Sequence, residues 1–142
     1  MNAQLTFTLE ATPRREDLVH IRNILLEYDR GTLTTDGHHP VIILVREDGR
    51  RLVAGILGTA HHGWLHLDMI WVEDAFRRQG IGQKLMEMAE AEGRRHGCHH
   101  CMLSTMSEAA RVLCRRIGYE EFAELENHPV GRSKFYMRRA LA

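Results

Sequence analysis

The sequence contains no apolar run approaching the roughly 18 residues that a membrane-spanning helix needs, so no association with a membrane is expected. It also lacks an excess of charge, because 19 basic residues balance 19 acidic ones. A nucleic-acid-binding protein held by a general positive field is therefore not expected. The first residues have neither the basic segment nor the apolar segment of a signal peptide, which favours a cytoplasmic location.

Disulfides and metal sites are also not expected. The three cysteines, Cys98, Cys101 and Cys114, are an odd number, which favours free thiols. Cys98 and Cys101 enclose two histidines, but the segment enters a strand, where successive side chains point to opposite faces and do not converge on a metal. The ten histidines, several of them adjacent, are interpreted as turn and surface residues.

What the sequence does have is an ordinary globular composition. Of its 142 residues, 44% are apolar and 27% are charged. This length and mixture predict a single domain that spans residues 1–142.

The periodicity predicts strands and helices in alternation. Leu5, Phe7 and Leu9 alternate with threonines and predict a strand over 5–10. Thr12 and Pro13 predict a helix start, and Leu18, Ile21, Leu25 and Tyr28 share one face of a helix that ends at Gly31. The remaining expected strands are Val41–Glu47, Leu52–Thr59, Trp64–Val72, Cys98–Thr105, Tyr119–Leu125 and Phe135–Leu141, and the remaining expected helices run over Gly80–His96 and from a Ser107 cap to Gly118.

In the strand Trp64–Val72 we expect Leu65, Leu67, Met69 and Trp71 to share one face. The order of elements predicts an α/β fold with a mixed sheet and helices on both faces.

The clearest candidate for a functional motif lies between the strand Trp64–Val72 and the long helix that follows it. Glycines stand at 80 and 82, just where this helix begins, and Arg77 and Arg78 precede them. The first N–H groups of a helix have no helical partner, and glycines let a bulky anion approach them closely. The segment 77–82 therefore predicts a pyrophosphate site, with mobile positive charge from the two arginines. Alternatively, the glycines serve only to pack the helix against the sheet.

Two other glycine-rich phosphate motifs do not fit. A dinucleotide fingerprint needs a third glycine at position 85, which is Leu85, and the Gly-Lys-Ser/Thr of a Walker A loop is absent.

The pattern Arg-x-x-Gly-x-Gly between a strand and a helix resembles the acetyl-CoA pyrophosphate loop of the GNAT superfamily of N-acetyltransferases. The resemblance continues to the C-terminus through Trp71-Val72, Ala89-Glu90, Gly97-Cys98 and Ile117-Gly118-Tyr119. It implies a mostly antiparallel sheet in which one parallel pair, Trp64–Val72 and Cys98–Thr105, splays apart to admit acetyl-CoA. The residues that it assigns to the cofactor are Ile70, Trp71, Val72, Arg77, Arg78, Gln79, Gly80, Ile81, Gly82, Gln83 and Ser107.

The implied reaction is direct attack of an amine on the thioester, with a backbone N–H of the central strand polarising the carbonyl. The amine then needs a base, for which Asp68 and Glu73 are the candidate carboxylates. Asp68 is either a cleft residue or a structural hydrogen-bond partner. For Glu73, a helix-capping or solvated role is favoured.

The family usually has a tyrosine, the acid for the leaving thiolate, at the position of Cys114. Here Cys114 is either that acid or a core residue on the apolar face of its helix. An aromatic-Gln pair of the subgroup is also replaced, by Glu108-Ala109, which alters a wall near the acceptor site.

The expected activity is acetyl transfer from acetyl-CoA to a primary amine of a small molecule, without a metal. The alternatives are a protein N-terminus or lysine as acceptor, and an acyl-CoA-binding module that has lost catalysis. Members of the family often pair through their C-terminal strands, so a homodimer is a further expectation.

Overall fold

The computed structural model describes residues 3–32 and 38–141. Its contacts divide the chain into two compact units, Met1–Thr35 and Asp36–Ala142, each of which is described by itself. Among the described residues, no helix has the length and apolar character that crossing a membrane would require.

The first unit contains helix α1, Arg15–Thr32, with Glu16 and Asp17 in its first turn. The predicted strand 5–10 is wrong, because residues 3–10 form no helix or strand. Alternation alone does not make a strand, which also needs a partner for its backbone groups, and the described sheet does not include this segment. The helix starts later than Pro13 because its first turn closes on the Arg14 carbonyl, which accepts from Asp17 N and Leu18 N.

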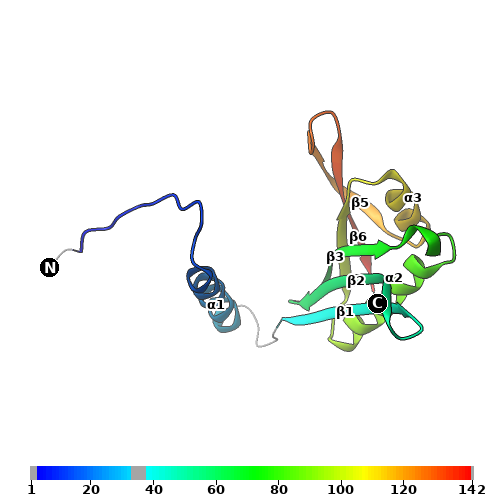
Figure 1. The fold of residues 1–142 in the computed structure, drawn as a ribbon, viewed down its shortest axis with the longest axis horizontal. Helices are drawn as coiled ribbons and strands as arrows, with labels where there is room; N and C mark the ends of the chain where they lie inside the picture. The colour runs from blue at the N-terminus through cyan, green and yellow to red at the C-terminus, as the bar shows by residue number, and fades with distance from the viewer. Residues whose placement is uncertain (1–2, 33–37, 142) are drawn as a thin grey trace. The chain divides into compact units, whose positions relative to one another are not determined.

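The second unit is built on a six-stranded sheet in the order β1-β2-β3-β4-β6-β5 (Figure 1). All neighbouring strands are antiparallel except β3 and β4, which are parallel. This confirms the mixed, mostly antiparallel sheet. The strands are β1 His39–Glu47, β2 Arg51–His61, β3 Trp64–Val72, β4 His100–Thr105, β5 Glu120–Glu126 and β6 Ser133–Ala140.

The meander β1-β2-β3 is closed by two tight turns. Asp48 and Gly49 have φ of 51° and 70°, and His62 and Gly63 have φ of 52° and 80°. Two successive residues with positive φ give the backbone twist that suits a tight antiparallel hairpin.

Helix α2 (Ile81–Arg95) packs on β1, β2 and β3, and helix α3 (Glu108–Arg116) contacts β4. A short 3-10 helix, η1 (Asp74–Phe76), which the periodicity did not predict, connects β3 to the segment before α2. The core lies between α2 and the sheet, and its fully buried side chains include Ile56, Leu65, Leu85 and Met137.

A β-bulge interrupts β3 in the middle. Leu57 of β2 pairs with Met69, whereas the next residue, Gly58, pairs with Leu67, so Asp68 is the extra residue. The bulge reverses the alternation of faces. Before the bulge, Leu65 and Leu67 point to the core. After the bulge, the residues on that side are Ile70, which faces α2, and Val72, which packs on the core. The expectation that Leu65, Leu67, Met69 and Trp71 share one face is therefore wrong.

Candidate active site

Strands β3 and β4 separate where the bulge begins. Their parallel pairing runs from Trp64 with His100 to Leu67 with Leu103. Strand β3 then continues to Val72 and β4 to Thr105, but the described pairing between them has ended. Over Met69–Val72, β3 is paired only with β2. Its other edge is therefore available to hydrogen-bond an extended ligand, as the resemblance implied.

The segment before α2 has the backbone conformation of an anion-binding turn. Arg78 and Gly80 have positive φ, 64° and 78°, and Gly80 is the N-cap residue of the helix, with no side-chain hydrogen bond to cap it. The first backbone N–H that is bonded within the helix is that of Lys84, which donates to Gly80 O. The N–H groups of Ile81, Gly82 and Gln83 therefore lie at the positive end of the helix dipole, ahead of the helical ladder.

The two glycines of this turn are not required by packing. A Cβ placed on Gly80 meets nothing within 4 Å, and one placed on Gly82 meets only Ile70 Cδ1, at 4.0 Å. The glycine that packs α2 against the sheet is Gly93, where a Cβ would lie 3.2 Å from Leu65 Cδ2. The helix-packing explanation of the 80/82 pair is therefore excluded, and open space remains above the helix start.

Arg77 is not the mobile charge that the sequence suggested. Its Nε donates to Val72 O at 3.0 Å, and its guanidinium lies 3.1 Å from Asp74 Oδ1. The side chain therefore fastens the turn to the end of β3. Its neighbour Arg78 carries the other positive charge of the turn, on a backbone with positive φ.

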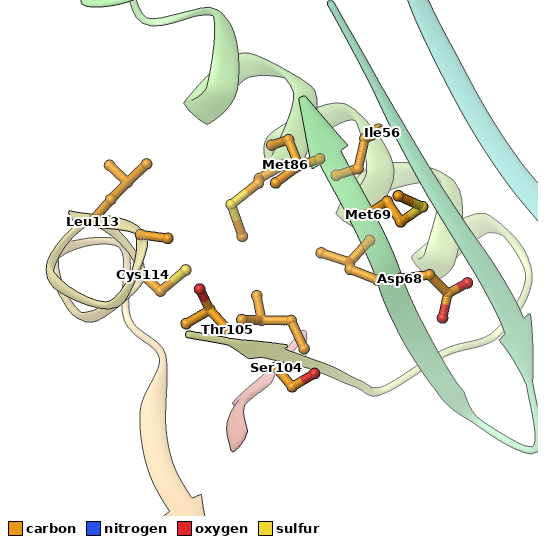
Figure 2. Close-up of a pocket in the computed structure, with 12 residues that line it drawn as sticks. Ile56, Asp68, Met69, Met86, Ser104, Thr105, Leu113 and Cys114 are labelled. Atoms are coloured by element: carbon orange, nitrogen blue, oxygen red, sulfur yellow. The ribbon is translucent and has the colours of Figure 1, made fainter. Parts of the chain in front are cut away.

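A cavity of about 100 Å³, open to solvent, occupies the space between the separated strands (Figure 2). Figure 2 shows Met86, Cys114 and Thr105 turned toward its interior, whereas the Asp68 carboxylate points away from it. Its lining is mainly apolar and comes from β2, β3, β4, α2 and α3. Ile70 lines the cavity and its side chain also faces Gly82, so the cavity reaches the start of α2.

Of the two candidate carboxylates, only Asp68 belongs to this cavity. It is exposed and sits at the bulge, where the strand turns its side chain out of the regular alternation. Glu73 instead forms an ion pair with Arg51, with 2.7 Å between Nη1 and Oε1. The capping role favoured for Glu73 is wrong, because it stands at the N-cap of η1 without a side-chain cap bond.

Cys114 is buried, with 4% of its surface exposed, and it belongs both to the core and to the cavity wall. Burial, and secondarily the charge of Glu90, raises the pKa of its thiol to about 11. The group is therefore a protonated thiol at neutral pH. Ser107 caps α3, since its hydroxyl accepts from Ala110 N at 3.2 Å, as predicted from the sequence.

The structure adds a residue that we did not identify from the sequence, Gly58. A Cβ on Gly58 would lie 2.6 Å from His66 O, so only glycine allows β2 to approach β3 this closely beside the bulge. A glycine inside an apolar strand is itself a signal for a bulge or a close approach, and Gly58 carries that signal.

Glu90, Tyr119 and Cys101, which are buried, form a polar cluster with the partly buried Arg139. Glu90 is 2% exposed, and its carboxylate lies 3.1 Å from Arg139 Nη1. The Tyr119 hydroxyl lies 3.4 Å from Glu90 Oε2 and 3.1 Å from Cys101 Sγ. Burial raises the pKa of Glu90, and the positive charge of Arg139 partly offsets this rise. Burial also raises the pKa of Cys101, to about 12. These groups tie α2 to β4, β6 and the start of β5.

All three cysteines are buried free thiols, as expected from the sequence. No group of three or more His, Cys, Asp or Glu residues suited to a metal ion occurs in the described part of the chain.

Comparisons with known proteins agree with this geometry. A model of the acetyltransferase (GNAT) family matches residues 6–119. An acetyltransferase of Agrobacterium fabrum is 28% identical over 135 residues, which cover 95% of this chain and 98% of that protein. The blasticidin-S acetyltransferase of Streptomyces morookaense is 33% identical over 81 residues, 56% of this chain and 60% of that protein.

Among solved structures, an acetyltransferase from Agrobacterium tumefaciens aligns with a TM-score of 0.89 at 28% identity, covering 96% of this chain and 99% of that one. The family match, the separated strand pair and the glycine-bearing helix start agree, and the chain belongs to the acetyltransferase (GNAT) family.

Proposed function

We propose that this acetyltransferase transfers the acetyl group of acetyl-CoA to the primary amine of a small molecule, in a complex that holds both substrates. The observation that carries the proposal is the space beside the two glycines at the start of α2. Gly80 and Gly82 leave space that no protein atom requires, directly beside the open edge of β3. This combination suits a ligand with a pyrophosphate at one end and an extended amide chain at the other.

In this proposal the pyrophosphate binds the N–H groups of Ile81, Gly82 and Gln83, with Arg78 adding positive charge. The pantetheine amides pair with the free edge of β3 near Ile70 and Val72, and a backbone N–H of the same edge polarises the thioester carbonyl. Trp71, Arg77, Gln79 and Ser107 complete the cofactor site. Arg77 acts mainly by holding the turn, through Val72 O and Asp74.

Asp68 is the carboxylate that serves the acceptor. Its side chain points away from the cavity interior, so it is suited to an amine that reaches the thioester from the other side of the separated strands (Figure 2). Glu73 is not assigned a catalytic role, because Arg51 already pairs with it. A small acceptor is supported by the blasticidin-S acetyltransferase, whose name identifies an acetyl acceptor of that size class.

Two measurements test the proposal. Thermal melts with acetyl-CoA at about 100 times its dissociation constant are expected to show about 2.7 kcal/mol of added stability, whereas free ATP gives no comparable shift. Thiol release from acetyl-CoA, followed with a panel of small amines and with peptides, is expected to depend on a small amine. Binding without turnover on any amine would instead identify an acyl-CoA-binding module.

A further inference from the structure

One end of the cavity lies where β3 and β4 come together. Leu67 and Leu103 form the last pair of the two strands, and both line the cavity, whereas Ile70 lines it beside the start of α2. A thioester with its pyrophosphate at the start of α2 and its pantetheine along Ile70 and Val72 directs its acyl group toward the Leu67–Leu103 end. The side chains around that end therefore decide which acyl groups fit.

The walls present hydrocarbon and sulfur to the interior of the cavity. Figure 2 shows Met86 and Cys114 turned inward, and Asp68, the only charged residue among the described residues that line the cavity, points its carboxylate away. The hydroxyl of Thr105, which also turns inward, already accepts a hydrogen bond from Ser107 N at 3.0 Å. Such a lining favours a saturated hydrocarbon chain over an acyl group that ends in a carboxylate.

The cavity is also larger than an acetyl group needs. Its volume is about 100 Å³, and one water needs roughly 10–15 Å³ of such space, so it accommodates about seven atoms of that size. An acetyl thioester fills only part of this space with its two carbons, its oxygen and its sulfur. Met86, an unbranched side chain with several rotatable bonds, can adjust to a longer group. The remaining space suits one or two further methylene groups.

We propose that the protein also transfers propionyl and butyryl groups, and that Ala110 and Cys114 set the upper limit of acyl length. This rests on the proposed function and extends it from acetyl to short saturated acyl groups. The two residues have some of the smallest side chains of the lining, and they lie one turn apart on one face of α3.

The bonds that form and break are those of acetyl transfer. The lone pair of the free amine forms the C–N bond with the acyl carbon, and the C–S bond breaks with its electron pair going to CoA thiolate. One proton then leaves the nitrogen for the thiolate or for water.

The first test compares four CoA thioesters by isothermal titration without an amine: acetyl-, propionyl-, butyryl- and succinyl-CoA. Propionyl- and butyryl-CoA should bind at least as tightly as acetyl-CoA, with a gain of up to about fourfold for each methylene that is fully buried. Succinyl-CoA has as many acyl carbons as butyryl-CoA but ends in a carboxylate. It should bind at least about tenfold more weakly than butyryl-CoA, because the apolar walls offer its charge no partner.

The second test fills the cavity from α3, with Ala110→Leu and Cys114→Leu. The ratio of kcat/KM for butyryl-CoA to that for acetyl-CoA should fall by at least about tenfold, because the added side chain occupies the space of the extra methylenes. The matched control is Val112→Leu, which enlarges a 38% exposed side chain on the same helix outside the lining and should keep the wild-type ratio. Melts confirm that each variant is folded. Ala110 is only partly buried, so its variant remains usable if Cys114→Leu does not fold.

Two results overturn the inference. One is weaker binding of propionyl- or butyryl-CoA than of acetyl-CoA to the wild-type protein, and the other is an unchanged ratio in the folded filling variants. Absence of acetyl-CoA binding, or of turnover with every amine, contradicts the proposed function instead. The titrations distinguish these failures because they compare acyl groups without requiring turnover.

Discussion

The two halves of β3 differ in what surrounds them. From Trp64 to Leu67 the strand is paired on both sides, with β2 and with β4. From Asp68 to Val72 it is paired only with β2, and a cavity and the start of α2 lie along its inner face. The glycines near each half follow the same division: a Cβ on Gly58 or Gly93 would press on protein atoms, whereas a Cβ on Gly82 would meet only Ile70 Cδ1, at 4.0 Å. In the proposed function, β3 is therefore scaffold up to the bulge and the acetyl-CoA-binding edge beyond it.

The largest expected effect is on the ligand side of this division. Gly82→Glu should weaken acetyl-CoA binding by at least about a hundredfold, because a carboxylate beside the pyrophosphate costs several kcal/mol. The folded protein should be kept, since a side chain at this position meets only Ile70 Cδ1, at 4.0 Å. Isothermal titration with acetyl-CoA and a thermal melt of the apo protein measure the two quantities. Wild-type affinity in the variant would mean that the pyrophosphate binds elsewhere.

A comparable effect on rate, but not on cofactor binding, is expected at the bulge. Asp68→Asn should lower turnover by about a hundredfold at neutral pH while leaving the acetyl-CoA dissociation constant unchanged. Steady-state kinetics across pH measures the first quantity, and isothermal titration with acetyl-CoA measures the second. A near-normal rate and profile would make Asp68 a structural residue of the bulge.

A substitution beside the first half of β3 should change the stability of the fold rather than acetyl-CoA binding. Gly58→Ala should cost about 1–3 kcal/mol of unfolding free energy, because its Cβ would lie 2.6 Å from His66 O, which is backbone and cannot move aside. The matched substitution is Gly82→Ala, which has room and a helical backbone, so it should leave the apo protein unchanged or stabilise it by up to about 1 kcal/mol. Urea unfolding of the two variants compares them. Equal destabilisation would remove the distinction between the two kinds of glycine.

The smallest effect on activity is expected at Cys114. Cys114→Ala should lose less than about tenfold in turnover, because a thiol whose pKa burial raises to about 11 gives little driving force for protonating CoA thiolate. The cost should fall on stability, about 1 kcal/mol or somewhat more, since the side chain is part of the core.

The control for this prediction is Cys114→Ser, which keeps a donor. A loss beyond a hundredfold in the alanine variant, partly restored by serine at equal stability and cofactor affinity, would make Cys114 the acid after all.

The sequence predicted the elements well wherever one periodicity ran unbroken. The bounds of β3 and the Ser107 cap of α3 are as predicted, and the strand pair separates as the resemblance implied. The failures are where a local pattern depends on a distant partner. The alternation at Leu5 and Leu9 predicts a strand only if another strand pairs with it, and the described sheet contains none that does.

The site shows the same limit. The face of the sheet on which Met69 and Trp71 lie depends on a bulge opposite Leu57 and Gly58. No pattern within β3 itself reveals this bulge. The sequence places Arg77 in the turn before α2, but its bond to Val72 O is a tertiary contact that spacing alone does not predict. The stacking of His61 with His38 and His66 was also missed, because these rings come from different segments of the chain.

Amide hydrogen exchange of β3, with and without acetyl-CoA, tests the division of this strand most directly. If the second half is the binding edge, the peptide that covers Met69–Val72 gains protection when acetyl-CoA binds, together with the start of α2 around Ile81–Gln83. The peptide that covers Trp64–Leu67, already paired on both sides, should exchange equally slowly in both states. Saturating acetyl-CoA that leaves the exchange of Met69–Val72 unchanged would contradict the account.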